Sequence, residues 1–217
     1  MEKRRIITID GPAASGKSSV ARLVADKLEL PFVSSGLLYR AATYLALSRA
    51  QDLEDEAGLL SLLERHDVDL IAIPIEPNRV QIDAEDLTAA LHTDDVDAAV
   101  SMVAKHKGVR RWVDARLRET KGAFVVEGRD MGRAVFPEAA HKVYLTATPE
   151  ARALRRVGER AGNLRDVTAL LRLRDERDAR QLEPAADAHH IDTSDLDLDA
   201  VVGAVLAYLE PGWTEAG

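Results

Sequence analysis

An eight-residue run near the start of the chain has the residue types and spacing that can hold a chain of phosphates. It reads Gly11-Pro-Ala-Ala-Ser-Gly16-Lys17-Ser18 and matches the pattern G-x-x-x-x-G-K-[ST] at every fixed position. The glycines let the backbone curl so that successive N–H groups point into one cavity, and a helix that begins near Lys17 adds the positive end of its dipole. Lys17 is placed to neutralise the outer phosphates of a nucleoside triphosphate, and the hydroxyl of Ser18 to bind Mg²⁺. The residues expected to contact this donor are Gly11, Pro12, Ala13, Ala14, Ser15, Gly16, Lys17, Ser18 and Ser19.

The phosphate-binding run does not by itself say what receives the phosphate, because GTPases, motor ATPases and small-metabolite kinases share it. The guanine-specifying pattern [NT]-K-x-D of GTPases is absent, and Asp55-Glu-Ala-Gly58, which matches D-x-x-G, lies in a polar helical stretch. No predicted strand ends in the Asp-Glu pair of a motor ATPase, and Glu127 is the nearest candidate for a carboxylate that polarises a metal ion. A kinase is favoured. A regulatory or motor NTPase and a nucleotide-binding protein without turnover remain alternatives.

Two clusters after predicted strands carry groups that could bind a second substrate. In Ser34-Ser-Gly-Leu-Leu-Tyr-Arg40, Tyr39 and Arg40 fall on the first turn of a helix, where an arginine can bind a phosphate through two hydrogen bonds. In Glu127-Gly-Arg-Asp-Met-Gly132, two glycines flank Arg129 and Asp130 and suggest tight turns that hold both side chains toward the ligand. A surface arginine and a local Arg–Asp pair are the structural alternatives for these clusters.

A third cluster, Arg174-Asp-Glu-Arg-Asp-Ala-Arg180, lies in a basic helical region. Arg174 and Asp178 are four residues apart and share a helix face, so an arginine could bind phosphate while the carboxylate accepts sugar hydroxyls. A solvated helix with ion pairs is the alternative. Residues 152–180 hold nine Arg and five Asp or Glu in a chain whose net charge is −8, which suggests a small anionic ligand and not a nucleic-acid polymer.

The hydrophobic patterns of the chain predict elements that would position these clusters. Strands are expected at 5–10, 31–33, 123–126, 142–146 and around 190–191, and helices at 17–28, 36–49, 54–66, 94–120, 149–160, 163–180 and from 198. Their alternation predicts an α/β fold, a P-loop NTPase core with a parallel five-stranded sheet flanked by helices. A hairpin of strands at 68–73 and 79–82 predicts a small inserted subdomain at about 60–100.

The composition limits the class of protein. A length of 217 residues with 46% hydrophobic and 30% charged residues suits a single globular domain with an insertion. There is no cysteine, so disulfides and thiol chemistry are excluded. The acidic balance and the 4% aromatic content argue against a nucleic-acid partner. No apolar run is long enough for a bilayer span or a signal peptide, so we expect no membrane partner and a cytoplasmic location.

Taken together, the motifs resemble bacterial cytidylate kinases, the (d)CMP kinases of the nucleoside monophosphate kinase group. The resemblance rests on I-T-I-D-G-P-x-x-x-G-K-[ST], S-G-x-x-Y-R, the run from Glu127 to Pro137 and Pro184-Ala-Ala-Asp-Ala188, and it covers about 5–210. It implies a single kinase domain over 1–217 with a core at about 1–60 and 100–217, the monophosphate-binding insertion and a short helical lid at about 152–166. The family often has Asp where this chain has Ser34.

The resemblance also implies roles for individual residues. Ser35, Arg110 and Asp130 match contacts to cytosine, and Arg40 and Arg129 match clamps on the CMP phosphate. Tyr39 belongs to the same substrate-binding motif. Ser101, Arg174 and Asp178 match positions that hold the pentose, and Arg155, Arg156 and Arg160 are similar to lid arginines that close over the transferring group. The stretch from Arg174 to Pro184 is shorter than in relatives, so a third phosphate clamp falls on Arg180 or near Gln181; we take Arg180.

The implied activity is transfer of the γ-phosphoryl group of ATP to CMP or dCMP, giving CDP or dCDP in pyrimidine nucleotide metabolism. Catalysis would rest on Lys17, Mg²⁺ and the arginines Arg129, Arg155, Arg156 and Arg160. The expected partners are the small molecules ATP and CMP or dCMP, and we expect a monomer. A kinase for another nucleoside monophosphate or for a small metabolite such as shikimate is the alternative within the same class.

Overall fold

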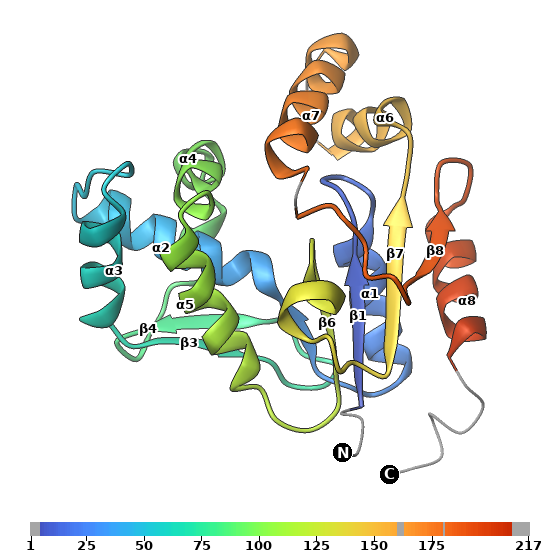
Figure 1. Cartoon of the computed structure of the whole chain (residues 1–217), viewed down its shortest axis with the longest axis horizontal. Coiled ribbons are helices and arrows are strands. Elements are labelled where there is room, and N and C mark those ends of the chain that lie inside the picture. Colours follow the sequence, from blue (N-terminus) through green and yellow to red (C-terminus); the bar gives the residue numbers. More distant parts are fainter. Residues whose placement is uncertain (1–4, 160–162, 180, 210–217) are drawn as a thin grey trace. The chain divides into compact units, whose positions relative to one another are not determined.

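The structure is a computed structural model that describes residues 5–159, 163–179 and 181–209 (Figure 1). Its contacts divide the chain into two compact units, one formed by residues 1–31 and 122–217 and the other by residues 32–121. Each unit has its own hydrophobic core, and each is described separately below.

A five-stranded parallel sheet confirms the predicted fold class; four of its strands belong to the first unit, and the residues of β2 (Phe32–Ser34) are counted in the second. Its strand order is β2-β6-β1-β7-β8, formed by β2 (Phe32–Ser34), β6 (Phe124–Gly128), β1 (Ile6–Asp10), β7 (His141–Thr146) and β8 (His189–Asp192). Strand β1 pairs in parallel with β6 and with β7, and β7 pairs in parallel with β8. Every residue of β1 and of β6 is buried, because helices cover both faces of a parallel sheet. The central strands are therefore mostly apolar, and their buried polar residues are Thr8, Asp10 and Glu127.

Helices of the first unit pack on the sheet and on each other. Helix α1 (Lys17–Lys27) contacts β6 and α8 (Leu198–Tyr208), and α6 (Pro149–Glu159) packs on α7 (Leu164–Asp178). Figure 1 shows α6 and α7 beyond the carboxyl ends of β1 and β7, the end of the sheet at which ligands bind in open α/β folds. A short π-helical segment, η2 (Met131–Val135), follows β6. None of the helices that the structure describes is long and apolar enough to cross a lipid bilayer.

The second unit is built around helix α2 (Ser35–Ser48). Its antiparallel sheet contains β3 (Val68–Ile71), β4 (Arg79–Ile82) and β5 (Glu85–Asp86), followed by a 3-10 turn, η1 (Thr88–His92). Helices α3 (Glu56–Glu64), α4 (Asp94–Ala104) and α5 (Lys107–Arg118) all contact α2. The predicted hairpin lies inside this unit, which extends beyond 60–100 because these helices pack on one shared core.

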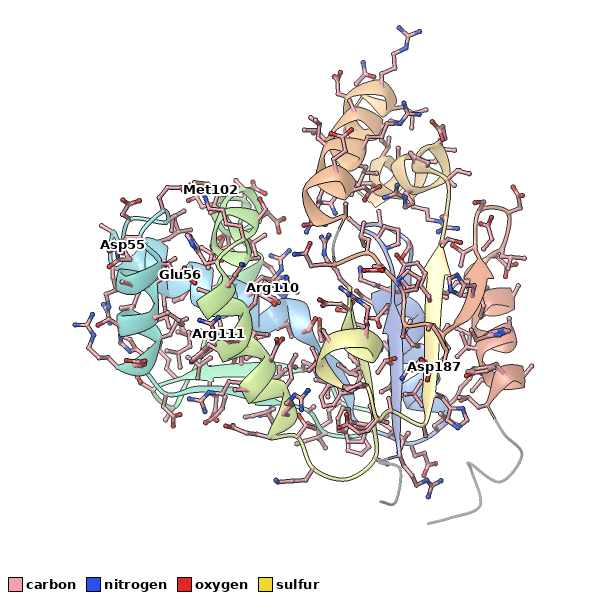
Figure 2. The ribbon with its side chains drawn as sticks, viewed as in Figure 1. Asp55, Glu56, Met102, Arg110, Arg111 and Asp187 are labelled. Atoms are coloured by element: carbon pink, nitrogen blue, oxygen red, sulfur yellow. The ribbon has the colours of Figure 1, made fainter. Side chains whose placement is uncertain are left out.

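The stretch at 94–120 is helical as predicted, but it is divided into two helices. Helix α4 ends at Ala104, and α5 begins at Lys107. The break is held by residues just before and within α3: Lys105 pairs with Glu54, and Glu56 accepts a hydrogen bond from the backbone N–H of Gly108. Figure 2 shows Glu56 at the start of α3, on the side of that helix nearer α5. These contacts join segments far apart in sequence, so local periodicity does not reveal them.

Candidate active site

The predicted phosphate-binding run forms the loop between β1 and α1. Gly11 has a φ of 153°, Ala14 a φ of 59°, and Gly16, which precedes α1, a φ of 86°. The first turn of α1 contains no acidic residue, so its free N–H groups and the dipole remain available to an anion. The buried Ser15 hydroxyl oxygen has no hydrogen-bond partner among the described residues. The loop therefore has the geometry of an anion-binding site, with the Ser15 hydroxyl and the N–H groups at the start of α1 available to a ligand.

Close packing makes glycine necessary at position 11. A Cβ there would overlap the carbonyl oxygen of Leu145 on β7, and the backbone φ disfavours any other residue. We expect Gly11→Ala to lower the free energy of unfolding by roughly 2 kcal/mol or more. Gly203→Ala on α8 is the matched control, because a Cβ there meets nothing within 4 Å, and it should stabilise the chain by about 0.5–1 kcal/mol. Urea unfolding of both variants checks the prediction, and equal effects would contradict it.

Lys17 and Glu127 bring opposite charges together beside the loop. The ammonium of Lys17 lies 3.9 Å from a carboxylate oxygen of Glu127, and it donates to the carbonyl of Pro12 at 3.4 Å. Burial lowers the pKa of Lys17, while Glu127 acts in the opposite direction. A partly buried cation with one weak carboxylate contact gains from the arrival of phosphate, as the predicted role requires.

Two arginines of α6 contact backbone carbonyls of the loop. Arg155 donates to the carbonyl oxygen of Ser15 at 3.3 Å and to the hydroxyl of Thr193 at 3.0 Å. Arg152 is 3% exposed, donates to the carbonyl of Ala13 at 3.1 Å and pairs with Asp175 of α7. Sequence analysis missed Arg152, since nothing in an arginine-rich helix marks which guanidinium points inward. Arg156 is half-buried on the same helix, and the predicted lid residue Arg160 lies outside the described residues.

The predicted acceptor residues of the first unit form a second charged group. Arg129, after β6, pairs with Asp178 of α7, and the Nε atom of Arg174 lies 3.8 Å from the same carboxylate. Asp130 is 7% exposed and precedes η2. The structure thus brings together three residues that the sequence placed in two separate clusters. Arg180, the predicted third clamp, lies outside the described residues.

Arg40 is fixed within the second unit. Its guanidinium donates to the carbonyl oxygen of Leu91 at 2.9 Å and pairs with Asp97 of α4. Ser101, one helical turn after Asp97, is exposed on α4. A half-buried arginine held by one carboxylate and one carbonyl is well oriented for an anion. The sequence identified Arg40 and Ser101 but not Asp97.

The remaining predicted contacts of the second unit lie at the start of α2 and on α5. Ser35 is buried at the first position of α2, and Tyr39 is half-buried one turn later. Arg110 is half-buried on α5, and Figure 2 shows it on the side of α5 away from α3. Tyr39 and Arg110 are therefore partly accessible to solvent, whereas Ser35 is only 5% exposed.

Asn78, in the turn before β4, was missed by sequence analysis although it fixes the strand that leads into α2. Its side-chain amide donates to the carbonyl of Phe32 at 2.6 Å and accepts from the backbone N–H of Ser34 at 3.1 Å. The Pro-Asn pair in a predicted turn was the available signal, but it indicated only the turn.

We expect Asn78→Ala to lower the free energy of unfolding by roughly 2 kcal/mol, because it leaves two backbone groups of β2 without these partners. Asn78→Asp keeps the acceptor for Ser34 but turns a carboxylate oxygen toward the carbonyl of Phe32, so it should destabilise at least as much. Thermal unfolding of both variants tests this. An aspartate variant as stable as the unsubstituted chain would contradict the assignment.

Comparison with known proteins identifies the family. A family model described as cytidylate kinase matches residues 7–211. The chain belongs to the cytidylate kinase family. It is 58% identical to a cytidylate kinase of Thermus thermophilus over 95% of this chain and 99% of that protein. It is 52% identical to a cytidylate kinase of Deinococcus radiodurans over 93% of this chain and 97% of that protein. A solved Thermus thermophilus structure shares the fold at 17% identity, with a TM-score of 0.50 and coverage of 97% of this chain and 100% of that one.

Proposed function

We propose that this chain transfers the γ-phosphoryl group of ATP to CMP or dCMP, forming CDP or dCDP. The observation that carries the proposal is its membership of the cytidylate kinase family over nearly its whole length. The phosphate-binding loop and the separate arginine–carboxylate groups support it, because such a kinase must hold two phosphate-bearing ligands. ATP is the donor expected of this family. We further propose a cytoplasmic monomer that acts on small molecules and not on nucleic acid.

The loop and its neighbours would hold the donor. The N–H groups at the start of α1 and the ammonium of Lys17 would bind the β and γ phosphates. Ser18 is exposed in the first turn of α1, and no cluster of three or more metal-ligating side chains occurs among the described residues. This donor set fits Mg²⁺, which takes few protein ligands and binds through substrate phosphates. When bound, Mg²⁺ would neutralise charge on the donor phosphates, with Ser18 as its protein ligand.

The acceptor residues are proposed from the resemblance, position by position. Arg40 and Arg129 would bind the CMP phosphate, with Arg180 as a third clamp. Ser101, Arg174 and Asp178 would hold the pentose, and Ser35, Arg110 and Asp130 the base. In the described structure Arg40 and Arg129 are each paired with a carboxylate, Asp97 and Asp178. These carboxylates keep the arginines oriented, and a bound phosphate would compete for them or share them.

The chemistry requires positioning more than proton transfer. The acceptor phosphate is already ionised near neutral pH, so the chain supplies alignment and charge neutralisation through Lys17 and the arginines. The segment at about 152–166 is proposed as the lid, and its arginines Arg155, Arg156 and Arg160 would close over the transferring group. Exclusion of water by the lid would suppress hydrolysis, the competing reaction.

Coupled detection of ADP tests the proposal. ATP, Mg²⁺ and the chain are incubated with CMP, dCMP, UMP, AMP, shikimate or buffer alone. We expect CMP and dCMP to give the fastest ADP release and buffer alone to give little. Equal rates with CMP, dCMP and buffer would contradict the proposal. A fast rate with buffer alone would indicate a regulatory or motor NTPase, and a preference for AMP or shikimate another kinase.

A further inference from the structure

Asp10 occupies a position that the proposed roles above leave unused. It is the last residue of β1, directly precedes Gly11 of the phosphate-binding loop and lies opposite Gly128 in the register with β6. Its residue surface is 5% exposed. A buried carboxylate at the joint between the central strand and the donor loop is costly, so its contacts reveal what it does.

Both oxygens of Asp10 accept hydrogen bonds from the same short segment. Oδ1 accepts from the backbone N–H of Met131 at 2.9 Å, and Oδ2 accepts from that of Gly132 at 2.8 Å. These amides begin the π-helical segment η2, whose preceding residue makes no side-chain capping hydrogen bond. Asp10 therefore supplies the cap from a strand more than a hundred residues away. Single π-helical turns are uncommon and concentrate at functional sites.

The segment held by Asp10 carries two residues of the proposed acceptor site. Arg129 and Asp130 lie between β6, which pairs with β1, and the two amides that Asp10 binds. The segment also packs closely on β1 at Gly132, because a Cβ there would lie 2.6 Å from the hydroxyl of Thr8. The backbone around Arg129 and Asp130 is thus clamped onto the strand that enters the donor loop.

The surroundings of Asp10 disfavour its charged form. Burial raises the pKa of Asp10 from 3.8 to about 7, and the nearby carboxylates Asp130 and Glu127 act in the same direction. The backbone N–H groups of Gly132 and Met131 oppose this rise. The charged or titratable groups that interact with it from other elements are Glu127 on β6, Lys17 on α1 and Tyr144 on β7.

We propose that Asp10 is a positioning residue for phosphoryl transfer, whose carboxylate holds the Arg129–Asp130 segment in register with the phosphate-binding loop. This inference rests on the proposed function, since Arg129 and Asp130 are assigned to the acceptor. Asp10 touches neither substrate; it acts through the two amides it binds. One carboxylate thereby links the residue that begins the donor loop to the segment that binds the acceptor.

Asp10→Asn tests the proposal, since asparagine has nearly the same shape as aspartate. Its oxygen can accept from one of the two amides, but its NH₂ group cannot accept from the other. We expect kcat/KM for CMP to fall about 100-fold, the cost typical of misplaced reacting groups, with KM for ATP changed less than about threefold. Asp197→Asn is the matched control. Asp197 also accepts from a backbone N–H at a helix start, that of Ala200 at 2.8 Å, in the same unit and outside the site. It should leave both constants unchanged.

The pH profile separates positioning from simple stabilisation. As the pH falls through about 7, Asp10 gains a proton and can no longer accept from both amides, so kcat at saturating substrates should fall. This acidic limb should be absent in Asp10→Asn and present in Asp197→Asn. The raised pKa also means that the folded chain binds a proton between pH 3.8 and about 7, so its contribution to stability is lost as the pH rises through that range. Asp10→Asn should flatten that slope.

Amide hydrogen exchange gives a readout that does not need activity. In Asp10→Asn at least one of the amides of Met131 and Gly132 should exchange at least about 10-fold faster, while in Asp197→Asn the exchange of Ala200 should stay nearly unchanged, because the asparagine oxygen still accepts from it. If the unsubstituted chain does not act on CMP, the proposed function fails while the exchange still reports whether Asp10 holds the segment. Unchanged exchange, unchanged kcat/KM for CMP, or a variant that loses its fold at both pH 6 and pH 8 would each overturn the positioning role.

Discussion

Replacement of Lys17 by alanine is expected to lower kcat with ATP and CMP by about 1000-fold, the upper range for loss of one preorganised charge at a transferring group. The expected loss follows from the position of Lys17. Its ammonium belongs to the first residue of α1, directly after the loop proposed to bind the donor phosphates, and its side chain is partly buried. Initial rates at saturating ATP and CMP measure the effect.

Lys27→Ala is the control for Lys17→Ala, because Lys27 is exposed in the last turn of the same helix. It should change kcat less than twofold, about the level of an ordinary surface substitution. Lys17→Ala also removes the cation 3.9 Å from Glu127, so its thermal unfolding must be measured alongside. A folded Lys17→Ala variant with unchanged kcat would refute the role given to Lys17.

Arg129→Ala is expected to lower kcat/KM for CMP by about 100-fold or more, which corresponds to about 2.7 kcal/mol of transition-state stabilisation. KM for ATP should change much less than kcat/KM for CMP, because Arg129 pairs with Asp178 of α7 and is assigned to the acceptor phosphate. Steady-state rates at varied CMP, and separately at varied ATP, distinguish the two constants.

Arg133→Ala provides the matched comparison for Arg129→Ala. Arg133 lies four residues on, in the same segment, and pairs with the exposed Glu183. Its loss should leave kcat/KM for CMP within about twofold of the original value, since exposed ion pairs contribute little. Equal losses in the two variants would mean that Arg129 supports the segment and does not bind the acceptor.

The phosphate-binding loop and the sheet could be predicted from the sequence because their signals are local. Gly11, Gly16 and Lys17 have a fixed spacing directly after an apolar strand, and the structure places the loop between β1 and α1. The strands at β6 and β7 read as short apolar runs for the same reason: they are buried on both faces. The local sequence pattern was enough to predict these elements because neighbouring residues determine their conformation.

The missed features depend on partners far along the chain. Arg152 is buried because Asp175 and the carbonyl of Ala13 receive its guanidinium, and no periodicity distinguishes it from Arg155 or Arg156. The break between α4 and α5 depends on contacts from Glu54 and Glu56. Such features can be recognised only once the fold is known. The functional roles of Arg156 and Ser101 remain predictions from motif resemblance.

The carbonyl of Ser15 has a consequence for biosynthesis. It accepts hydrogen bonds from Arg155, 140 residues further along, and from Thr193, 178 residues further along. A ribosome therefore releases the donor-binding loop early and the groups that brace it only near the end of translation. A nascent chain halted before Thr193 would carry the complete glycine-rich motif without its bracing, and nucleotide should protect it from proteolysis far less than it protects the finished chain.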